Sequence, residues 1–205
     1  MESKLFTPVT FGPLTLRNRT IRSAAFESMC PGNAPSDMLL NYHRSVAAGG
    51  IGMTTVAYAA VTRSGLSFDR QLWMRPEIIP GLRRLTDAVH AEGAAAGIQL
   101  GHCGNMSHKS ICGCTPVGAS GGFNLYSPTF VRGLRADELP ELARAYGRSV
   151  NLAREAGFDA VEIHAGHGYL ISQFLSPATN HRKDEFGGSL QNRMRFMDMV
   201  MEEVM

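Results

Sequence analysis

Strand-like and helix-like segments alternate along most of the chain. Short apolar or β-branched runs, typical of strands buried on both faces, are each followed by a longer segment with apolar residues at helical spacing. The expected strands cover residues 21–25, 53–61, 95–100 and 160–164, and the expected helices cover residues 36–47, 77–92, 136–156 and 189–205. This alternation predicts parallel α/β architecture built from four βα units.

The boundaries of these segments carry matching signals. Ser36 and Ser189 are placed to cap the first and last helices, and Gly93 and Gly157 follow the second and third. Ahead of the first strand, Leu5–Leu16 has the pattern of a small hairpin that turns at Gly12-Pro13. We therefore expect a hairpin followed by the βα units.

Two segments of over twenty residues, Gly101–Arg132 and Ala165–Gly188, follow the third and fourth strands. Loops of that length in a compact domain are usually functional, and a flavodoxin-like open sheet normally has shorter ones. Right-handed βα repeats close when about eight strands are present. The predicted fold class is therefore α/β, a TIM (β/α)8 barrel. Residues 1–205 would be the N-terminal half of one domain, with its C-terminal half absent.

Composition and charge narrow the function classes. The chain has 205 residues, of which 44% are hydrophobic and 19% charged, and its formal net charge is +2. Such a composition is typical of a soluble globular protein with a packed core. The small, scattered charge predicts no nucleic-acid or membrane partner, and the start of the chain lacks a signal-peptide pattern. We expect a cytoplasmic protein.

The four cysteines are Cys30, Cys103, Cys112 and Cys114. They do not form a paired CxxC zinc motif, and they are too few for a disulfide scaffold. Cys112-Gly113-Cys114 is the one close pair in the sequence. It could be redox-active or metal-binding, but we interpret it as reduced thiols in a loop.

Polar residues gather just after the expected strands, where barrel enzymes build their sites. Gln99 can offer its amide to a flat heterocycle, or it can satisfy buried strand ends. His164, His167 and Tyr169 leave the fourth strand in a glycine-rich setting. The two imidazoles could donate to one carbonyl oxygen and withdraw electron density from a conjugated double bond, and Tyr169 could deliver a proton.

Other interpretations remain open at this point. His102, His108, His164 and His167 could ligate a metal, although no HExxH or cysteine-rich pattern completes a ligand set, or the histidines could serve packing alone. Asn180–Ser189 is densely polar, and a solvated charged loop is its default interpretation. Gly187-Gly188 precedes a helix, but no full phosphate-binding motif accompanies it.

Taken together, these residues resemble the Old Yellow Enzyme family, the NADH:flavin oxidoreductases, over nearly the whole chain. The opening Leu5–Pro8 and Leu16–Arg19, and the pair His90–Gly93 and Gln99–His102, are similar to the family's pattern. Its most specific signature is matched by 155–159, 162–164, 167–170, 173–177, 180, 184–190 and 192–193.

The resemblance implies a barrel that holds FMN, is reduced by NADH or NADPH, and passes hydride to a small electron-poor alkene such as an α,β-unsaturated carbonyl. By similarity, His164 and His167 would bind the substrate's carbonyl or nitro oxygen. Tyr169 would protonate the α-carbon as a general acid. These three residues are the implied catalytic set.

The flavin would be bound at the strand ends. Gln99 would hydrogen-bond its pyrimidine edge, and the other implied flavin-lining residues are Ser23, Ala24, Ala25, Phe26, Ala57 and Tyr58. The family often has Thr or Cys near Phe26, so the hydrogen bond that tunes the flavin is not implied here. A small residue usually packs on the flavin from the second strand, which favours Ala57 over Tyr58.

The expected missing half has consequences of its own. The family's basic flavin contact, its phosphate site and any iron-sulfur cluster would all lie beyond Met205, so we expect little FMN binding by the isolated chain. The first hypothesis is a truncated or partial FMN-dependent ene-reductase or NAD(P)H oxidase. One alternative is a non-catalytic half-barrel module that pairs with another chain through exposed sheet edges, a homo-oligomer being one such pairing. The other is a metal-dependent barrel hydrolase.

Overall fold

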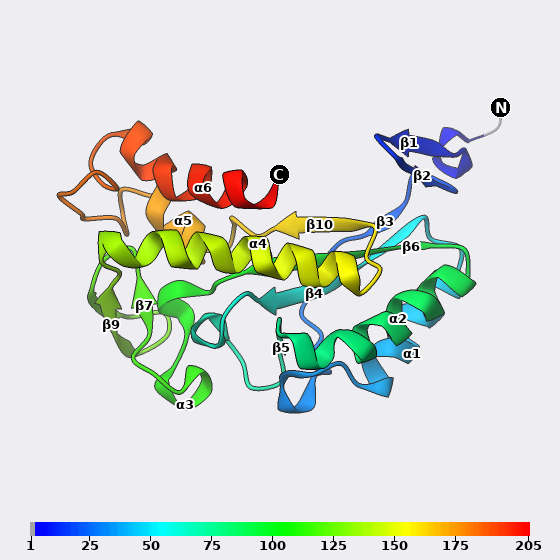
Figure 1. Ribbon diagram of the computed structural model, residues 1–205, viewed down its shortest axis with the longest axis horizontal. Coiled ribbons are helices and arrows are strands. Elements are labelled where there is room, and N and C mark those ends of the chain that lie inside the picture. Colours follow the sequence, from blue (N-terminus) through cyan, green and yellow to red (C-terminus); the bar gives the residue numbers. More distant parts are fainter. Residues whose placement is uncertain (1–2) are drawn as a thin grey trace. The chain divides into compact units, whose positions relative to one another are not determined.

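The computed structural model describes residues 3–205. Its strands are β1 (Val9–Phe11), β2 (Leu14–Leu16), β3 (Ile21–Arg22), β4 (Met53–Ala60), β5 (Leu72–Trp73), β6 (Ala95–Gly101), β7 (Val117–Gly118), β8 (Gly122–Asn124), β9 (Thr129–Gly133) and β10 (Ala160–Ile163). Its helices are α1 (Asp37–Ala48), α2 (Ile79–Ala91), α3 (Lys109–Cys112), α4 (Leu139–Glu155), α5 (Leu170–Leu175) and α6 (Leu190–Val204). Figure 1 labels most of them along the chain.

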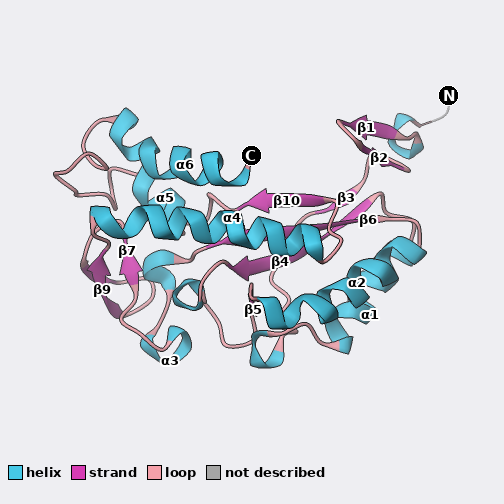
Figure 2. Ribbon diagram, viewed as in Figure 1, coloured by secondary structure: helices cyan, strands magenta, loops and turns pink. Residues whose placement is uncertain are grey.

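The main sheet has the strand order β10-β6-β4-β3, with β5 added on β4 (Figure 2). Strand β3 pairs with β4 in parallel, with Ile21 opposite Met53. Each of the four strands is followed in sequence by a helix, namely α1, α2, α4 or α6. Neighbours in the sheet are thus consecutive βα units, as in a barrel. The predicted order of strands and helices is confirmed.

The chain forms two compact units. Unit 1 comprises residues 1–59, 70–99 and 151–162, and unit 2 comprises residues 60–69, 100–150 and 163–205. The predicted hairpin is present in unit 1, where β1 and β2 pair antiparallel with Val9 opposite Leu16. Helices α1 and α2 pack together there, and their buried faces include Leu39, Leu82 and Leu85.

Arg17 joins several segment ends of unit 1. Its guanidinium donates to the carbonyl oxygens of Ala47 (2.5 Å), Ile51 (2.9 Å) and Glu92 (2.7 Å). Ala47 and Glu92 lie at the C-terminal ends of α1 and α2, whose last carbonyls have no partner within the helix. The arginine therefore supplies a cation and hydrogen bonds where helix ends favour both.

Unit 2 contains structure that the sequence did not predict. Residues 117–133 of the expected loop hold a small sheet of order β7-β9-β8, in which Phe123 pairs with Phe130. The second expected loop contains α5, which packs against α6. Ser189 caps α6 as predicted, because its hydroxyl accepts from the amide of Asn192.

Some predicted boundaries were also wrong. Strand β3 ends at Arg22 rather than near residue 25. The reason is that the side chain of Glu27 accepts the hydrogen bond from the Ala57 amide on β4, at 3.2 Å. A carboxylate thus occupies a donor that would otherwise extend the strand pairing.

Among the described residues, no helix is long and apolar enough to cross a membrane.

Candidate functional site

One face of the unit 1 sheet is open. A cavity of about 220 Å³ lies against it, and its lining residues are Ile21, Ser23, Met53, Thr55, Gly97, Ile98, Ala160, Val161 and Glu162. Side chains two residues apart on a strand share a face. Ala57 therefore lies on the same face as Met53 and Thr55, and Gln99 lies on the same face as Gly97.

Gln99 and Glu162 are joined at the ends of their strands. The Gln99 side chain is 8% exposed, and its Nε2 donates to Glu162 Oε1 at 2.6 Å. This bond fixes which end of the amide faces the carboxylate and leaves Oε1 to accept from another donor. Glu162 thus holds Gln99 on the face of the sheet that carries the cavity, rather than ligating a metal with the histidines.

The other predicted flavin-lining residues differ in exposure. Ser23 and Ala25 are exposed, Ala24 is half-buried, and the Phe26 side chain is 63% exposed. On β4, Ala57 is half-buried and Tyr58 is 7% exposed. Because the two are adjacent in a strand, they face opposite sides of the sheet, and Ala57 shares the side of the cavity. This placement favours the small residue as the flavin-facing one.

A buried charged cluster underlies the segment after β3. Glu27 Oε1 lies 2.7 Å from Arg22 Nη1 and 2.9 Å from His43 Nε2. The contact with His43 Nε2 is close, but its geometry is not that of a hydrogen bond. His43 Nδ1 is 2.8 Å from Thr54 Oγ1. The cluster anchors Glu27 and so positions the turn that carries Ser23–Phe26.

Sequence reasoning missed this cluster. A signal was present, since His43 lies on the buried stripe of α1 with Leu39 and Ala47, at intervals of one helical turn. A histidine in such a stripe needs a polar partner. Glu27 could not be matched with it from the sequence, because the two belong to different segments.

In unit 2, the three predicted catalytic residues come together. His164 Nε2 and His167 Nδ1 are 3.2 Å apart, and the ring of Tyr169 meets that of His164 edge-on with centroids 5.1 Å apart. The backbone amide of His164 donates to the carbonyl of Leu100, which extends the pairing of β10 and β6 by one residue. His164 is 7% exposed, whereas His167 is exposed.

The backbone at His167 is unusual. Its φ is +54°, in the left-handed region that non-glycine residues seldom adopt, and the following Gly168 has φ +68°. The turn brings the Tyr169 amide to the Gly166 carbonyl at 3.0 Å. A strained residue in a hydrogen-bonded turn is an observation that suggests function, because the strain must be offset by the surrounding contacts.

Tyr169 is held by a residue that sequence reasoning did not single out. Its hydroxyl lies 3.3 Å from Ser67 Oγ. Burial raises the pKa of Tyr169 above its usual value, and the hydrogen bond with Ser67 opposes that change. The phenol is therefore protonated at neutral pH, as a proton donor must be.

His102 has a different environment. Its Nδ1 accepts from the Gly104 amide at 3.0 Å, so the proton is on Nε2, which lies 3.1 Å from Ser64 Oγ. Burial lowers the pKa of His102 to about 4. It is thus a neutral histidine with both nitrogens engaged. Within residues 3–205, no three His, Cys, Asp or Glu side chains converge in a way that could hold a metal ion.

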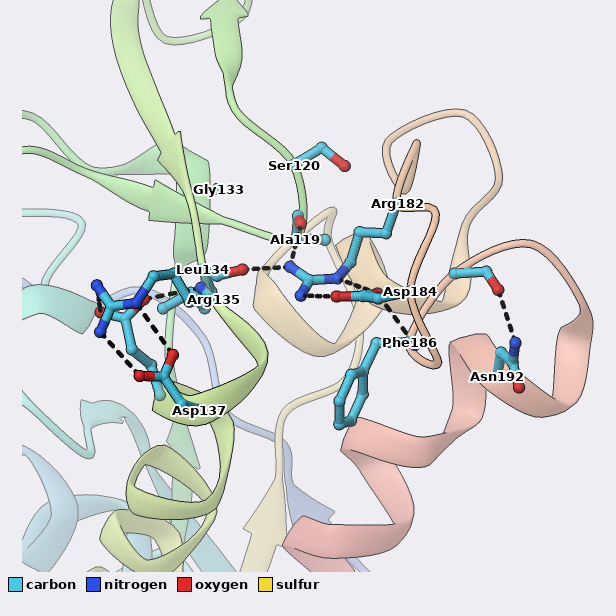
Figure 3. A network of polar contacts seen from close by, with 12 residues as sticks. Ala119, Ser120, Gly133, Leu134, Arg135, Asp137, Arg182, Asp184, Phe186 and Asn192 are labelled. Carbon is cyan, nitrogen blue, oxygen red and sulfur yellow. Dashed lines mark hydrogen bonds and ion pairs between the residues drawn. The ribbon is translucent and has the colours of Figure 1, made fainter.

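The polar stretch Asn180–Ser189 is not simply a solvated loop, and that default interpretation was wrong for its central residues. The Arg182 side chain is 8% exposed, and it donates to the Ala119 and Leu134 carbonyls and to Asp184 (Figure 3). Asn180 donates to two backbone carbonyls, each at 2.7 Å. This stretch therefore joins loops of unit 2, which explains its density of polar residues.

Comparison with known proteins agrees with these features. Residues 4–205 match the sequence profile of the NADH:flavin oxidoreductase / NADH oxidase family. The chain belongs to this family. The predicted resemblance to the Old Yellow Enzymes is thereby confirmed.

Relatives in this family differ in what they are named for. The chain is 44% identical over 200 residues to a 4,4'-dithiodibutanoate disulfide reductase of Rhodococcus erythropolis, covering 98% of this chain and 50% of that protein. It is 40% identical to a metal reductase of Desulforamulus reducens, covering 95% and 29%. It is 37% identical to an NADPH dehydrogenase of Bacillus subtilis, covering 100% and 60%. The chain thus spans about half the length of the first of these relatives.

Comparison with solved structures confirms the fold. The old yellow enzyme homologue from Zymomonas mobilis matches with a TM-score of 0.91 at 30% identity, covering 98% of this chain and 59% of that one. A morphinone reductase in complex with tetrahydroNAD matches with a TM-score of 0.91 at 29% identity, covering 99% and 60%. The predicted fold class, a TIM barrel represented by its first four βα units, is therefore confirmed.

Proposed function

We propose that the complete protein is an FMN-dependent oxidoreductase that carries hydride from NADH or NADPH to a small electron-poor alkene, such as an α,β-unsaturated carbonyl compound. Family membership supports the flavin chemistry. One observation favours an electron-poor alkene as the acceptor of the hydride, namely the contact of His164, His167 and Tyr169 in unit 2. It provides hydrogen-bond donors for an oxygen and an acid for a carbon.

The two histidines would bind the substrate oxygen. Nitrogens 3.2 Å apart can both lie within hydrogen-bond distance of one oxygen atom. In their mutual contact one nitrogen donates and the other accepts, so two donations to the substrate oxygen require the accepting imidazole to gain a proton on that nitrogen, by tautomerisation or by uptake from solvent. Two donors polarise the carbonyl and leave the β-carbon of a conjugated alkene short of electrons. Hydride addition at that carbon becomes easier.

Tyr169 would then protonate the α-carbon. Its raised pKa keeps the phenol protonated until the carbon becomes basic, which suits a general acid. Ser67 limits the directions in which the hydroxyl can point. We assign Tyr169 as the acid and Ser67 as a residue that positions it.

The strand ends of unit 1 fit a flat heterocycle with amide-like edges. Gln99 has an amide oxygen left to accept, Ala57 is small, and Phe26 is an exposed aromatic residue. We propose that Gln99, Ala57 and Ser23–Phe26 hold FMN. When bound, FMN supplies the hydride. The residues named here bind and orient it.

The rest of the FMN contacts are proposed to come from parts of the protein outside these residues. This chain covers 50% of the Rhodococcus relative and 60% of the Bacillus one, so both contain further residues. The cytoplasmic location, the lack of nucleic-acid and membrane partners, a homo-oligomeric state and the choice between NADH and NADPH stay predictions, as does the position of any iron-sulfur cluster.

A disulfide or an oxidised metal ion is the second candidate acceptor. The names of the Rhodococcus and Desulforamulus relatives favour it. The effect of Tyr169 separates the two candidates. Reduction of an alkene requires a proton on carbon. Reduction of a disulfide gives two thiolates, and reduction of a metal ion needs no proton. The same variant can therefore be tested with both kinds of acceptor.

The test uses the complete gene product loaded with FMN and reduced by NADPH without oxygen. Reoxidation is followed with 2-cyclohexenone and with 4,4'-dithiodibutanoate, in the unchanged protein, in Tyr169→Phe and in Tyr126→Phe. The last is a matched control, since Tyr126 is 93% exposed. We expect Tyr169→Phe to slow reoxidation by the alkene by about 10²- to 10⁴-fold and to leave the rate of the disulfide reaction nearly unchanged.

Two outcomes would overturn the proposal. If 2-cyclohexenone does not reoxidise the unchanged protein but the disulfide does, the alkene assignment is wrong. If Tyr169→Phe slows reoxidation by both acceptors by the same factor, the tyrosine is not the acid. Tyr126→Phe should match the unchanged protein with either acceptor.

A further inference from the structure

Two thiols of unit 2 lie in contact. Cys112 ends α3 and Cys114 follows it by two residues, and their sulfur atoms are 3.6 Å apart. Cys112 is 3% exposed, whereas Cys114 is exposed. One thiol of the pair is therefore accessible and the other is sheltered directly behind it.

The backbone between them allows a bond to form. Gly113 has φ +76°, a left-handed turn that L side chains rarely adopt, and it folds the chain so that both sulfurs lie on one side. A disulfide needs a sulfur–sulfur distance of about 2.05 Å. Closing the gap takes a shift of roughly 1.5 Å, which side-chain rotation and a glycine-centred turn can supply.

Cys114 also lines a groove. This groove has a volume of about 380 Å³, and its other lining residues are Thr62, Ser64, His102, Thr115, Val117, Arg132, Leu134, Glu138, Glu141, Leu142, Ala145 and Arg148. Its size suits a small molecule rather than a peptide segment. The exposed thiol therefore meets a space that a small reactant can enter.

The charges near the pair favour an anion. In the groove, Arg132 is paired with Glu138 and Arg148 with Glu141, so those cations are neutralised. Arg63 is different: it is exposed, its guanidinium lies beside Gly113, and its side chain forms no ion pair or hydrogen bond within residues 3–205. A carboxylate on an incoming molecule would find an unpaired cation there.

We propose that Cys112 and Cys114 form a dithiol site that is oxidised by small disulfides bearing carboxylates. The inference rests on the thiol geometry and not on the proposed flavin reaction. The thiolate of Cys114 attacks one sulfur of the small disulfide, forms a mixed disulfide and releases one thiolate. Cys112 then gives up its proton, attacks Cys114 Sγ and releases the second thiolate. The chain is oxidised by two electrons, and the small disulfide becomes two thiols.

The burial pattern sets the order of these steps. Among the cysteines of residues 3–205, Cys114 is the one that lines the groove, and Cys112 is the one whose sulfur contacts Cys114 Sγ. Burial and the contact with Cys112 raise the pKa of Cys114, and Arg132 and Arg63 oppose that change. The neutral thiol therefore predominates at neutral pH, and exchange is expected over minutes to hours, as is usual for thiols of that kind.

The experiment uses the complete gene product, reduced beforehand and incubated with oxidised glutathione in the absence of NADH and NADPH. Trypsin releases residues 110–132, a peptide that contains Cys112 and Cys114 and no other cysteine. We expect this peptide to lose two hydrogen atoms in the unchanged protein. We expect Cys112→Ser to retain glutathione on Cys114, and Cys114→Ser to form neither product.

Control variants make the result specific. Cys30→Ser should behave like the unchanged protein, because burial raises the pKa of Cys30 to about 12 and the residue is not part of the pair. Arg63→Ala should slow oxidation by glutathione disulfide by roughly threefold but not oxidation by the uncharged 2-hydroxyethyl disulfide. A peptide that stays reduced, or a stable glutathione adduct in the unchanged protein, would overturn the proposal. The proposal would also be overturned if Arg63→Ala slowed oxidation of the cysteine pair equally with both reagents.

Discussion

Two histidine sites in unit 2 follow neighbouring strands of the sheet and have opposite characters. His102, just after β6, is buried and engages both nitrogens with fixed partners, the Gly104 amide and Ser64. His164, just after β10, engages Nε2 with His167, which is itself exposed. A histidine held by the backbone serves the fold, whereas two histidines that bond to each other can exchange that bond for a ligand. The kind of partner, a backbone amide or a second histidine, distinguishes the two cases better than position along the barrel.

The largest effect is expected for the exchangeable pair. His164→Ala or His167→Ala removes one of two donors to the substrate oxygen, so alkene reduction should fall by about 10²- to 10³-fold. Steady-state rates with 2-cyclohexenone would measure this, alongside urea unfolding. If the variants unfold so easily that the loss of folded protein accounts for the loss of activity, the functional assignment is contradicted.

The next effect concerns the structural histidine. His102→Ala leaves a cavity and deprives the buried Gly104 amide of its acceptor, so the free energy of unfolding should fall by about 2–4 kcal/mol. Urea unfolding with a fluorescence signal would measure this difference. If unfolding is unchanged and alkene reduction falls instead, the two sites do not differ in the way described.

The titration of His102 gives a smaller effect. Because the pKa of His102 in the folded protein is about 4, below its ordinary value of 6.5, the unfolded chain binds a proton first on acidification. Stability is therefore complete above pH 6.5 and is lost as the pH falls toward 4. Between about pH 7 and about pH 5 the loss should be about 2 kcal/mol.

His102→Gln supplies the control for that titration. Glutamine does not titrate. Between about pH 7 and about pH 5, the unfolding free energy of the variant should therefore fall by about 2 kcal/mol less than that of the unchanged protein. Urea unfolding at a series of pH values would show it. Parallel pH profiles for the two proteins would mean that another group dominates.

The smallest effect concerns the strained backbone. His167 has φ +54°, which asparagine tolerates and valine does not. His167→Asn should keep the free energy of unfolding within about 0.5 kcal/mol, whereas His167→Val should lower it by about 1–2 kcal/mol. Equal stability of the two variants would show that the turn relaxes without cost.

The sequence predicted regular features and failed at irregular ones. Ser36 and Ser189 cap their helices as expected, because a cap depends on residues only a few positions away. The sheet of β7, β8 and β9 was missed, because strands of two to five residues are too short to show a period and their glycines are typical of loops.

The same limit applies to the candidate site. His164, His167 and Tyr169 could be predicted because they lie within six residues of each other. Ser67 and the partners of Arg182 could not, because they come from distant segments that only the fold brings together. Local sequence identified the groups that we propose to react, and the residues that contact them became visible only in three dimensions.

The central claim is that His164 and His167 act on the substrate oxygen. Anaerobic stopped-flow measurements on the FMN-loaded complete protein would test it directly, by separating flavin reduction with NADPH from flavin reoxidation with 2-cyclohexenone. In the His164→Ala, His167→Ala double variant, reduction should stay within about threefold of the unchanged protein and reoxidation should fall by at least about 10²-fold. Equal losses in both half-reactions, or an unchanged reoxidation rate, would contradict the account.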